Sequence, residues 1–279
     1  MRRSRNRFSL LASVVLVFAC GATAVFAQWW KYPTAGVPRT PDGKVNMSAP
    51  VPRTPEGRPD FTGIWLTDNP NCGPRPNDDS IVCGVELPMS REGINMGVGL
   101  PGGLPYQPWV AALVKERTAN QAKDDPHAYC LPDTFVRAYG LPHLLKFVQT
   151  PALLLMLNEM NAGYRQVFLD GRPLPEDPIP SWQGYSSAVW DGDTLVVTSN
   201  GFRNDIWIDW NGSLITESAR VRERIRRPGY GRLEVEVTVD DPKAYTRPWT
   251  VTLKQRLVVD TELVDEICLE NEKSTQRMK

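Results

Sequence analysis

Hydrophobic and polar residues alternate most clearly between positions 217 and 239 of the chain. The even-numbered arginines from Arg220 to Arg226 fall on one face, whereas Val221, Glu223 and Ile225 fall on the other. A Pro-Gly turn and a second alternating run at 232–239 follow. Because successive side chains of a strand point to opposite faces, the pattern predicts an antiparallel hairpin with one charged face and one covered face.

Similar runs extend this pattern over the C-terminal half of the chain. They predict a first strand at 61–65 and further strands at 144–149, 152–158, 164–170, 185–190, 194–199, 217–227, 232–239, 249–259 and 263–270. Several are joined by tight-turn sequences such as Asp191-Gly192, a strong hairpin signal. A meander of this length tends to close and so remove its exposed edges. We therefore predict a mainly β fold, an antiparallel closed or strongly curled barrel, with a β-sandwich as the alternative.

The N-terminal part of the chain reads differently. Residues 1–27 combine a basic start, a short apolar run and small residues before Ala27, which predicts a signal peptide and a secreted or periplasmic protein. The apolar run is too short for a stable membrane span. A lipid anchor at Cys20 is the less favoured alternative, because the bulky Phe18 fits a lipoprotein cleavage site poorly.

A Pro-rich near-repeat follows, in which residues 37–44 recur as 51–58. It predicts an extended arm over 28–60, because proline blocks helices and removes ladder donors. We expect one β-rich domain over 61–279, with the meander at 143–270. Residues 66–142 form a long loop excursion in which 109–123 has helical spacing.

The charge of the chain argues against one class of partner. The formal net charge is 0, and loss of the first 27 residues, which carry four arginines and no acid, leaves −4. A weakly acidic surface of mixed sign has no electrostatic footprint for nucleic acid. Exposed arginines opposite glutamates would pair across the strands instead.

Four cysteines remain after the signal segment: Cys72, Cys83, Cys130 and Cys268. An even number in an exported chain favours disulfides, and three pairings are possible. We favour Cys72–Cys83, which closes a short loop, together with Cys130–Cys268. A zinc site is the competing interpretation, but paired Cys-x-x-Cys spacing is missing and the chain has only two histidines. We therefore predict no metal and no cofactor.

Three charged residues are candidates for catalysis. Glu223 lies on the covered face, where burial disfavours the charged carboxylate and suits a general acid or base. The alternative is an ion pair with an inward arginine such as Arg165. Glu159 and Arg165 flank a turn and could meet across it, where with Tyr164 and Asp170 they could bind a carboxylated or polyhydroxy ligand. A turn-stabilising ion pair is the other interpretation.

Aromatic residues form a further candidate site. Tryptophan next to aspartate on loops is typical of sugar-binding surfaces, where rings stack and acids accept from hydroxyls. An aromatic plug closing one end of the barrel explains the same pattern without a ligand. The candidate ligand-binding residues are Tyr164, Tyr185, Trp190, Trp207, Asp209 and Trp210.

Seven segments together carry a resemblance to known sequences: 38–44, 59–65, 123–126, 164–168, 190–197, 240–249 and 268–272. They resemble a group of exported proteins of soil bacteria, a family that brings no established activity. In addition, Gly63-Ile64-Trp65 resembles the Gly-x-Trp of the first strand of lipocalin-type (calycin) barrels. That resemblance implies a ligand cavity inside the barrel and names no catalytic residue. Residues 66–142 separate the motif from the meander, whereas a lipocalin continues directly into strands.

These observations lead to three functional hypotheses. The first is an exported barrel that binds a small molecule, a sugar or a hydrophobic metabolite, in or on the barrel. The second is a metal-independent lyase, isomerase or hydrolase that uses an inward glutamate with Arg and Tyr. The third is a cell-envelope interaction module with the Pro-rich arm and residues 66–108 as its contact surface.

Overall fold

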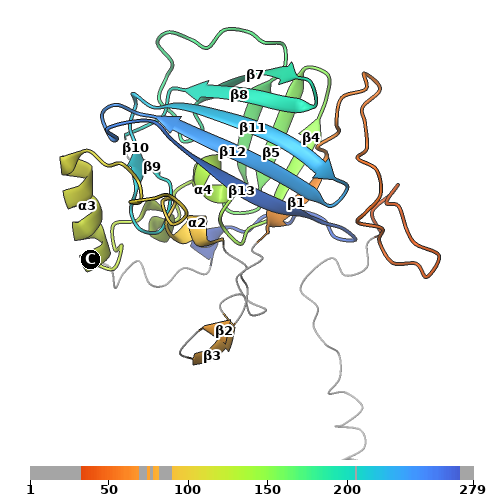
Figure 1. Ribbon diagram of the computed structural model, residues 1–279, viewed down its shortest axis with the longest axis horizontal. Coiled ribbons are helices and arrows are strands. Elements are labelled where there is room, and N and C mark those ends of the chain that lie inside the picture. Colours follow the sequence, from red (N-terminus) through yellow and green to blue (C-terminus); the bar gives the residue numbers. More distant parts are fainter. Residues whose placement is uncertain (1–32, 69–73, 76–77, 82–89, 205, 271–279) are drawn as a thin grey trace, which may run out of the picture. The chain divides into compact units, whose positions relative to one another are not determined.

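The computed structural model describes residues 33–68, 74–75, 78–81, 90–204 and 206–270 (Figure 1). The larger of two units comprises Thr34–Val259 and the residues from Leu263 onward, whereas Pro33 and Asp260–Glu262 fall in a second, small unit. The signal peptide and the Cys72–Cys83 pair, both predicted from the sequence, lie outside the described residues.

Nine strands close into a barrel in the order β1-β13-β12-β11-β8-β7-β6-β5-β4. The prediction of a mainly β, closed barrel is therefore confirmed, and the sandwich alternative is not adopted. The strands are β1 (Gly63–Thr67), β4 (Leu145–Gln149), β5 (Leu153–Asn158), β6 (Gly163–Phe168), β7 (Tyr185–Asp191), β8 (Thr194–Asn200), β11 (Arg220–Gly229), β12 (Arg232–Asp240) and β13 (Trp249–Val258). Two small sheets, β2 (Pro74–Arg75) with β3 (Asp78–Ile81) and β9 (Ile206–Trp207) with β10 (Leu214–Ile215), lie outside the barrel.

One neighbouring pair of barrel strands, β6 and β7, is parallel. Around a closed ring, strand directions can alternate throughout only if the number of strands is even. Nine strands therefore require a parallel seam, which the expectation of a purely antiparallel meander did not include. The seam is short, because β6 and β7 are paired only at Val167–Ser186 and Phe168–Ser187. The connection 169–184 carries the chain from one strand to the other.

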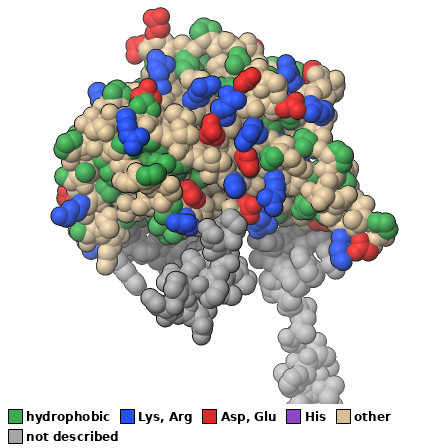
Figure 2. All heavy atoms as spheres, viewed as in Figure 1, with side chains coloured by type: hydrophobic (Ala, Val, Ile, Leu, Met, Phe, Trp, Pro, Cys, Tyr) green, Lys and Arg blue, Asp and Glu red, His purple; other side chains and the backbone are tan. Residues whose placement is uncertain are grey.

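The alternation that predicted the hairpin is confirmed on β11 and β12. Val221, Glu223 and Ile225 are buried, and Leu233, Val235, Val237 and Val239 face the same interior. Outside, Arg226 donates to Glu234 across the pair at 2.9 Å, whereas Arg224 reaches Asp191 at 3.1 Å. Figure 2 shows the resulting face, on which basic and acidic side chains are interspersed.

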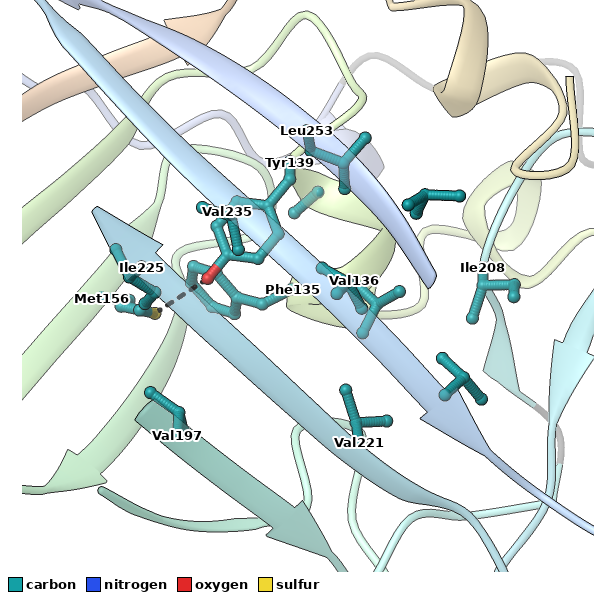
Figure 3. Close-up of a cluster of buried hydrophobic side chains, with 14 of the residues drawn as sticks. Phe135, Val136, Tyr139, Met156, Val197, Ile208, Val221, Ile225, Val235 and Leu253 are labelled. Carbon is teal, nitrogen blue, oxygen red and sulfur yellow. Dashed lines mark hydrogen bonds between the residues drawn. The ribbon is translucent and has the colours of Figure 1, made fainter. Parts of the chain in front are cut away.

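The interior of the barrel is filled by a segment of the 66–142 excursion. The short helix α4 (Phe135–Ala138) is buried at all four positions. Figure 3 shows Phe135, Val136 and Tyr139 lying among core residues of the barrel strands, including Ile225, Val235 and Leu253. A cavity inside the barrel, which the lipocalin resemblance implied, is thus occupied by this plug.

The rest of the described excursion contains the β2–β3 sheet and short helices. The predicted helix forms as α3 (Pro108–Ala119) and ends earlier than expected, because Gln121 and Ala122 adopt positive φ angles of 57° and 54°. The other helical elements are α2 (Arg91–Ile94), the 3-10 turn η1 (Pro126–Tyr129) and, near the C-terminus, η2 (Cys268–Glu270).

The predicted strand at 263–270 is wrong. The segment makes a single bridge, between Met160 and Glu266, before η2. Its alternating sequence suits a strand, but both edges of β1 are already occupied by β13 and β4. The segment therefore finds no free edge on β1, the strand next to β13.

The described part of the Pro-rich arm, from residue 34 to 60, does not form the extended structure that we predicted. Each repeat closes a tight turn, with Thr40 N–H donating to Lys44 and Thr54 N–H to Arg58, both at 2.8 Å. The second repeat is attached to the barrel, because Arg53 binds the carboxylate of Asp193 in the β7–β8 turn.

Candidate functional site

The predicted inward acid, Glu223, lies in an ion cluster inside the barrel. Its side chain is 0% exposed and forms a bidentate pair with Arg165, with 3.0 Å between Nη1 and Oε1. Tyr139 from the plug donates its hydroxyl to the same Oε1 at 2.9 Å. Ser186 and Ser199 accept from Arg165 at 3.1 and 2.9 Å. Glu223 therefore forms an ion pair with Arg165, which was the alternative to a role as a general acid or base.

Every N–H of the Arg165 guanidinium has an acceptor. Nε donates to Ser186, Nη1 to Glu223 and the sulfur of Met156, and Nη2 to Glu223 and Ser199. Burial alone would lower the pKa of Arg165, but the charge and hydrogen bonds of Glu223 raise it. Burial also raises the pKa of Tyr139 well above its usual range, and Glu223 adds to this. All N–H donors of Arg165 are thus used, and the raised pKa values of Arg165 and Tyr139 keep both groups protonated. These properties favour a structural role for the cluster.

Glu159 does not join this cluster, so the expected meeting of Glu159 with Arg165 across the β5–β6 turn is wrong. Glu159 instead accepts from the backbone N–H of Leu144 at 2.5 Å and lies 3.9 Å from His143 Nδ1. Its register explains the separation, because Arg165 pairs with Met156 and points inward, whereas Glu159 follows the end of β5. Burial raises the pKa of Glu159.

A groove with a volume of about 490 Å³ opens at the β6–β7 seam. Beyond the two paired positions the strands separate, and the edge of β6 at 163–166 faces the chain at 181–185. The residues that line the groove are Pro132, Asn161, Ala162, Gly163, Tyr164, Arg165, Gln166, Phe168, Ser181, Trp182, Gln183, Gly184, Tyr185 and Ser186. Two predicted ligand-binding residues, Tyr164 and Tyr185, are thus brought together here.

The facing wall of the groove is fixed by backbone contacts. Ser181 N–H donates to Gly201 at 3.0 Å, and Gln183 binds both the N–H of Phe135 and the carbonyl of Asp133. Gly184 has a φ of +63°, and a Cβ there would lie 2.5 Å from the carbonyl oxygen of Asn200. Only glycine fits this close approach, which holds the wall at Gly184 against Asn200.

The floor and the outer rim of the groove differ in chemistry. Tyr164, Gln166 and Phe168 alternate on the outer face of β6, and Tyr164 is 61% exposed. Phe168 stacks on Tyr185 with 5.3 Å between ring centroids. Arg165 reaches the groove from the inner face, with its charge neutralised by Glu223. The groove therefore offers aromatic side chains and neutral polar groups at its floor. Two of its rings also carry a guanidinium: Arg172 lies 4.0 Å from the ring centroid of Phe168, and Arg203 lies 4.7 Å from that of Trp182.

The other predicted aromatic residues lie elsewhere. Trp190 packs on Phe61 and on the guanidinium of Arg58. Trp207 is buried on β9 beneath Arg117, whereas Trp210 is partly exposed.

Asp209, the acid expected to bind a ligand next to these tryptophans, is buried. It accepts hydrogen bonds from the backbone of Met96 and Ser213 and from the Ser213 hydroxyl. Its oxygens hold a turn together, and the structure does not gather Trp190, Trp207, Asp209 and Trp210 into one surface.

The two histidines of the chain, His127 and His143, lie near each other, which we did not predict from the sequence. Their ring centroids are 5.9 Å apart. His127 Nδ1 is 2.7 Å from Asp133, and Arg137 connects Asp133 to Asp125. Burial alone would raise the pKa of Asp133, but the hydrogen bond from His127 and the charge of Arg137 hold it below its usual value. His127 and His143 are separated along the chain by the plug, so no local pattern revealed their contact.

The predicted disulfide between Cys130 and Cys268 is present, with 5.4 Å between the Cα atoms. It ties the end of η1 to η2, and such a bond is compatible with an exported protein. None of the helices within the described parts of the chain has the length and apolar character to cross a bilayer.

No protein-family model matches the chain, and neither does any curated protein or solved structure.

Proposed function

We propose that the protein binds an uncharged small molecule containing a ring, such as a sugar, in the groove at the β6–β7 seam. One observation carries the proposal: among the described residues that line the groove, Arg165 is the single charged side chain, and it is neutralised by Glu223 beneath an aromatic rim. The groove is within the roughly 300–1,000 Å³ typical of small-molecule sites. The ligand would lie on the barrel wall, since α4 fills the interior.

The polar groups of the groove support a neutral ligand. Among the described residues, the hydroxyl of Tyr164 and the amide of Gln166 have no protein partner and remain available to hydroxyls. Gln183 and Arg165 are committed to the protein. A charged ligand would lack a counter-ion at the floor, whereas a sugar ring would stack on Tyr164 and bind Gln166.

The disulfide supports placing this activity outside the cytoplasm, in the periplasm or the medium, because such bonds persist in oxidising compartments. The two other hypotheses, an enzyme that uses Glu223 and a cell-envelope interaction module, stay predictions.

The test is a screen of neutral mono- and disaccharides by saturation-transfer NMR, followed by titration of the best binder. Tyr164→Ala should weaken its binding about tenfold, which corresponds to the loss of one stacking contact of roughly 1.4 kcal/mol. Trp210→Ala is the matched control, because Trp210 is an exposed aromatic residue outside the groove. Equal losses in both variants, loss only in Trp210→Ala, or no binder in the screen would overturn the proposal.

A further inference from the structure

Three potential metal ligands from distant parts of the chain meet beside the β5–β6 turn. His143 precedes β4, Glu159 follows β5, and Glu266 lies in the C-terminal segment. We propose that these three residues form a binding site for a divalent transition-metal cation of the zinc or manganese class. This inference departs from the sequence-based expectation of no metal and is independent of the ligand groove.

The distances between the donor atoms suit a single ion. His143 Nδ1 lies 3.3 Å from a Glu266 oxygen and 3.9 Å from a Glu159 oxygen. One donor atom from each of the three residues lies within 4.8 Å of the others. With metal–ligand bonds of about 2.1 Å, tetrahedral donors are separated by roughly 3.4 Å. An ion could therefore be bound after small side-chain adjustments.

The backbone holds the two carboxylates side by side. Glu266 N–H donates to the carbonyl of Glu159 at 2.8 Å, and Asn161 N–H donates to the carbonyl of Glu266 at 2.6 Å. The Cys130–Cys268 disulfide closes the same segment two residues beyond Glu266. Two carboxylates held together repel each other, and a shared cation relieves that repulsion. The backbone hydrogen bonds and the disulfide thus hold the proposed ligands in place before any ion binds.

Further contacts orient the ligands and leave room for the ion. The N–H of Leu144 binds Glu159 and fixes its carboxylate, the kind of outer contact that metal ligands use. Glu266 is 56% exposed, so an ion can enter from its side. One imidazole with two carboxylates suits zinc or manganese better than magnesium or calcium, which prefer oxygen ligands alone.

The experiment is isothermal titration of the disulfide-bonded mature protein, freed of metal with a chelator, with zinc or manganese chloride. One equivalent should bind, and the melting temperature should rise with metal concentration. Magnesium chloride should bind at least tenfold more weakly. Glu266→Gln should weaken zinc and manganese binding at least tenfold and should not lower the metal-free melting temperature, because it removes the repulsion between the two carboxylates and Glu266 is exposed.

Glu270→Gln is the matched control, with the same charge change four residues further along the segment. It should bind zinc and manganese as the unaltered protein does. Absence of binding in the unaltered protein, or unchanged binding in Glu266→Gln, would overturn the proposal. The second outcome would place any bound ion elsewhere, including at thiols.

Discussion

Arg165 on β6 and Glu223 on β11 form a bidentate ion pair inside the barrel, with β7 and β8 lying between their strands. Taking two charges out of water costs several kcal/mol per ion, so such a pair persists only when its remaining hydrogen bonds are satisfied. Tyr139, Ser186 and Ser199 supply them. The pair and its partners therefore link the plug to four strands of the wall, β6, β7, β8 and β11.

Glu223→Gln should destabilise the protein by about 3–5 kcal/mol, because it leaves the Arg165 charge buried without a counter-ion. The free energy of unfolding from urea titration measures this. Glu234→Gln is the control, since its pair with Arg226 is partly exposed at the surface and its loss should cost less than about 1 kcal/mol. Similar losses in the two variants would refute the structural role of Glu223. If Glu223→Gln leaves the free energy of unfolding unchanged, Glu223 would again be a candidate for catalysis.

The sequence predicts the barrel wall well because its signals are local. Alternation along 217–239 determines which side chains of β11 and β12 face inward, and it placed Glu223 on the covered side. The Asp191-Gly192 turn likewise identified the β7–β8 hairpin. Period-two patterns and tight turns depend on neighbours in the chain, so one sequence suffices to find them.

The features that define the sites are not local. The parallel seam follows from the number of strands in the ring, which no segment encodes by itself. The plug helix α4 spans four residues, too few for a helical period to show. The contact between His127 and His143, and the position of Glu266 beside Glu159, depend on how the excursion and the C-terminal segment pack. Tyr164 and Tyr185 were identified by residue type, but the groove between them was not.

Gly184→Ala should destabilise the protein more than Gly192→Ala does. Gly192→Ala is the control, because Gly192 also has a positive φ, +58°, but no atom lies within 4 Å of its Cβ position. Backbone strain alone costs about 1–2 kcal/mol at either site. The clash with Asn200 should add roughly 1–3 kcal/mol at Gly184. Equal losses in urea titrations would show that the close approach at the groove wall is absent.

Replacing both Cys130 and Cys268 with serine should lower the free energy of unfolding by about 2–5 kcal/mol, because the bond spans a sequence separation of 138 residues. Urea titration measures the loss. Reducing agent should shift the unaltered protein toward the variant. Peptide mapping without reduction should recover Cys130 joined to Cys268. Two free thiols at these positions would contradict the pairing.

The attachment of the second repeat to the barrel should respond to acid. The hydrogen bonds and charge of Arg53 hold the pKa of Asp193 below its ordinary value of 3.8. A carboxylate with a depressed folded pKa contributes stability above the unfolded value, and this contribution disappears as the pH falls through the folded value. Carbon NMR of the Asp193 carboxyl should therefore show a midpoint below 3.8 that moves up in Arg53→Ala. Arg39→Ala, the same change in the first repeat, should leave that midpoint in place. A shared response would mean that Arg53 does not hold the repeat to the β7–β8 turn.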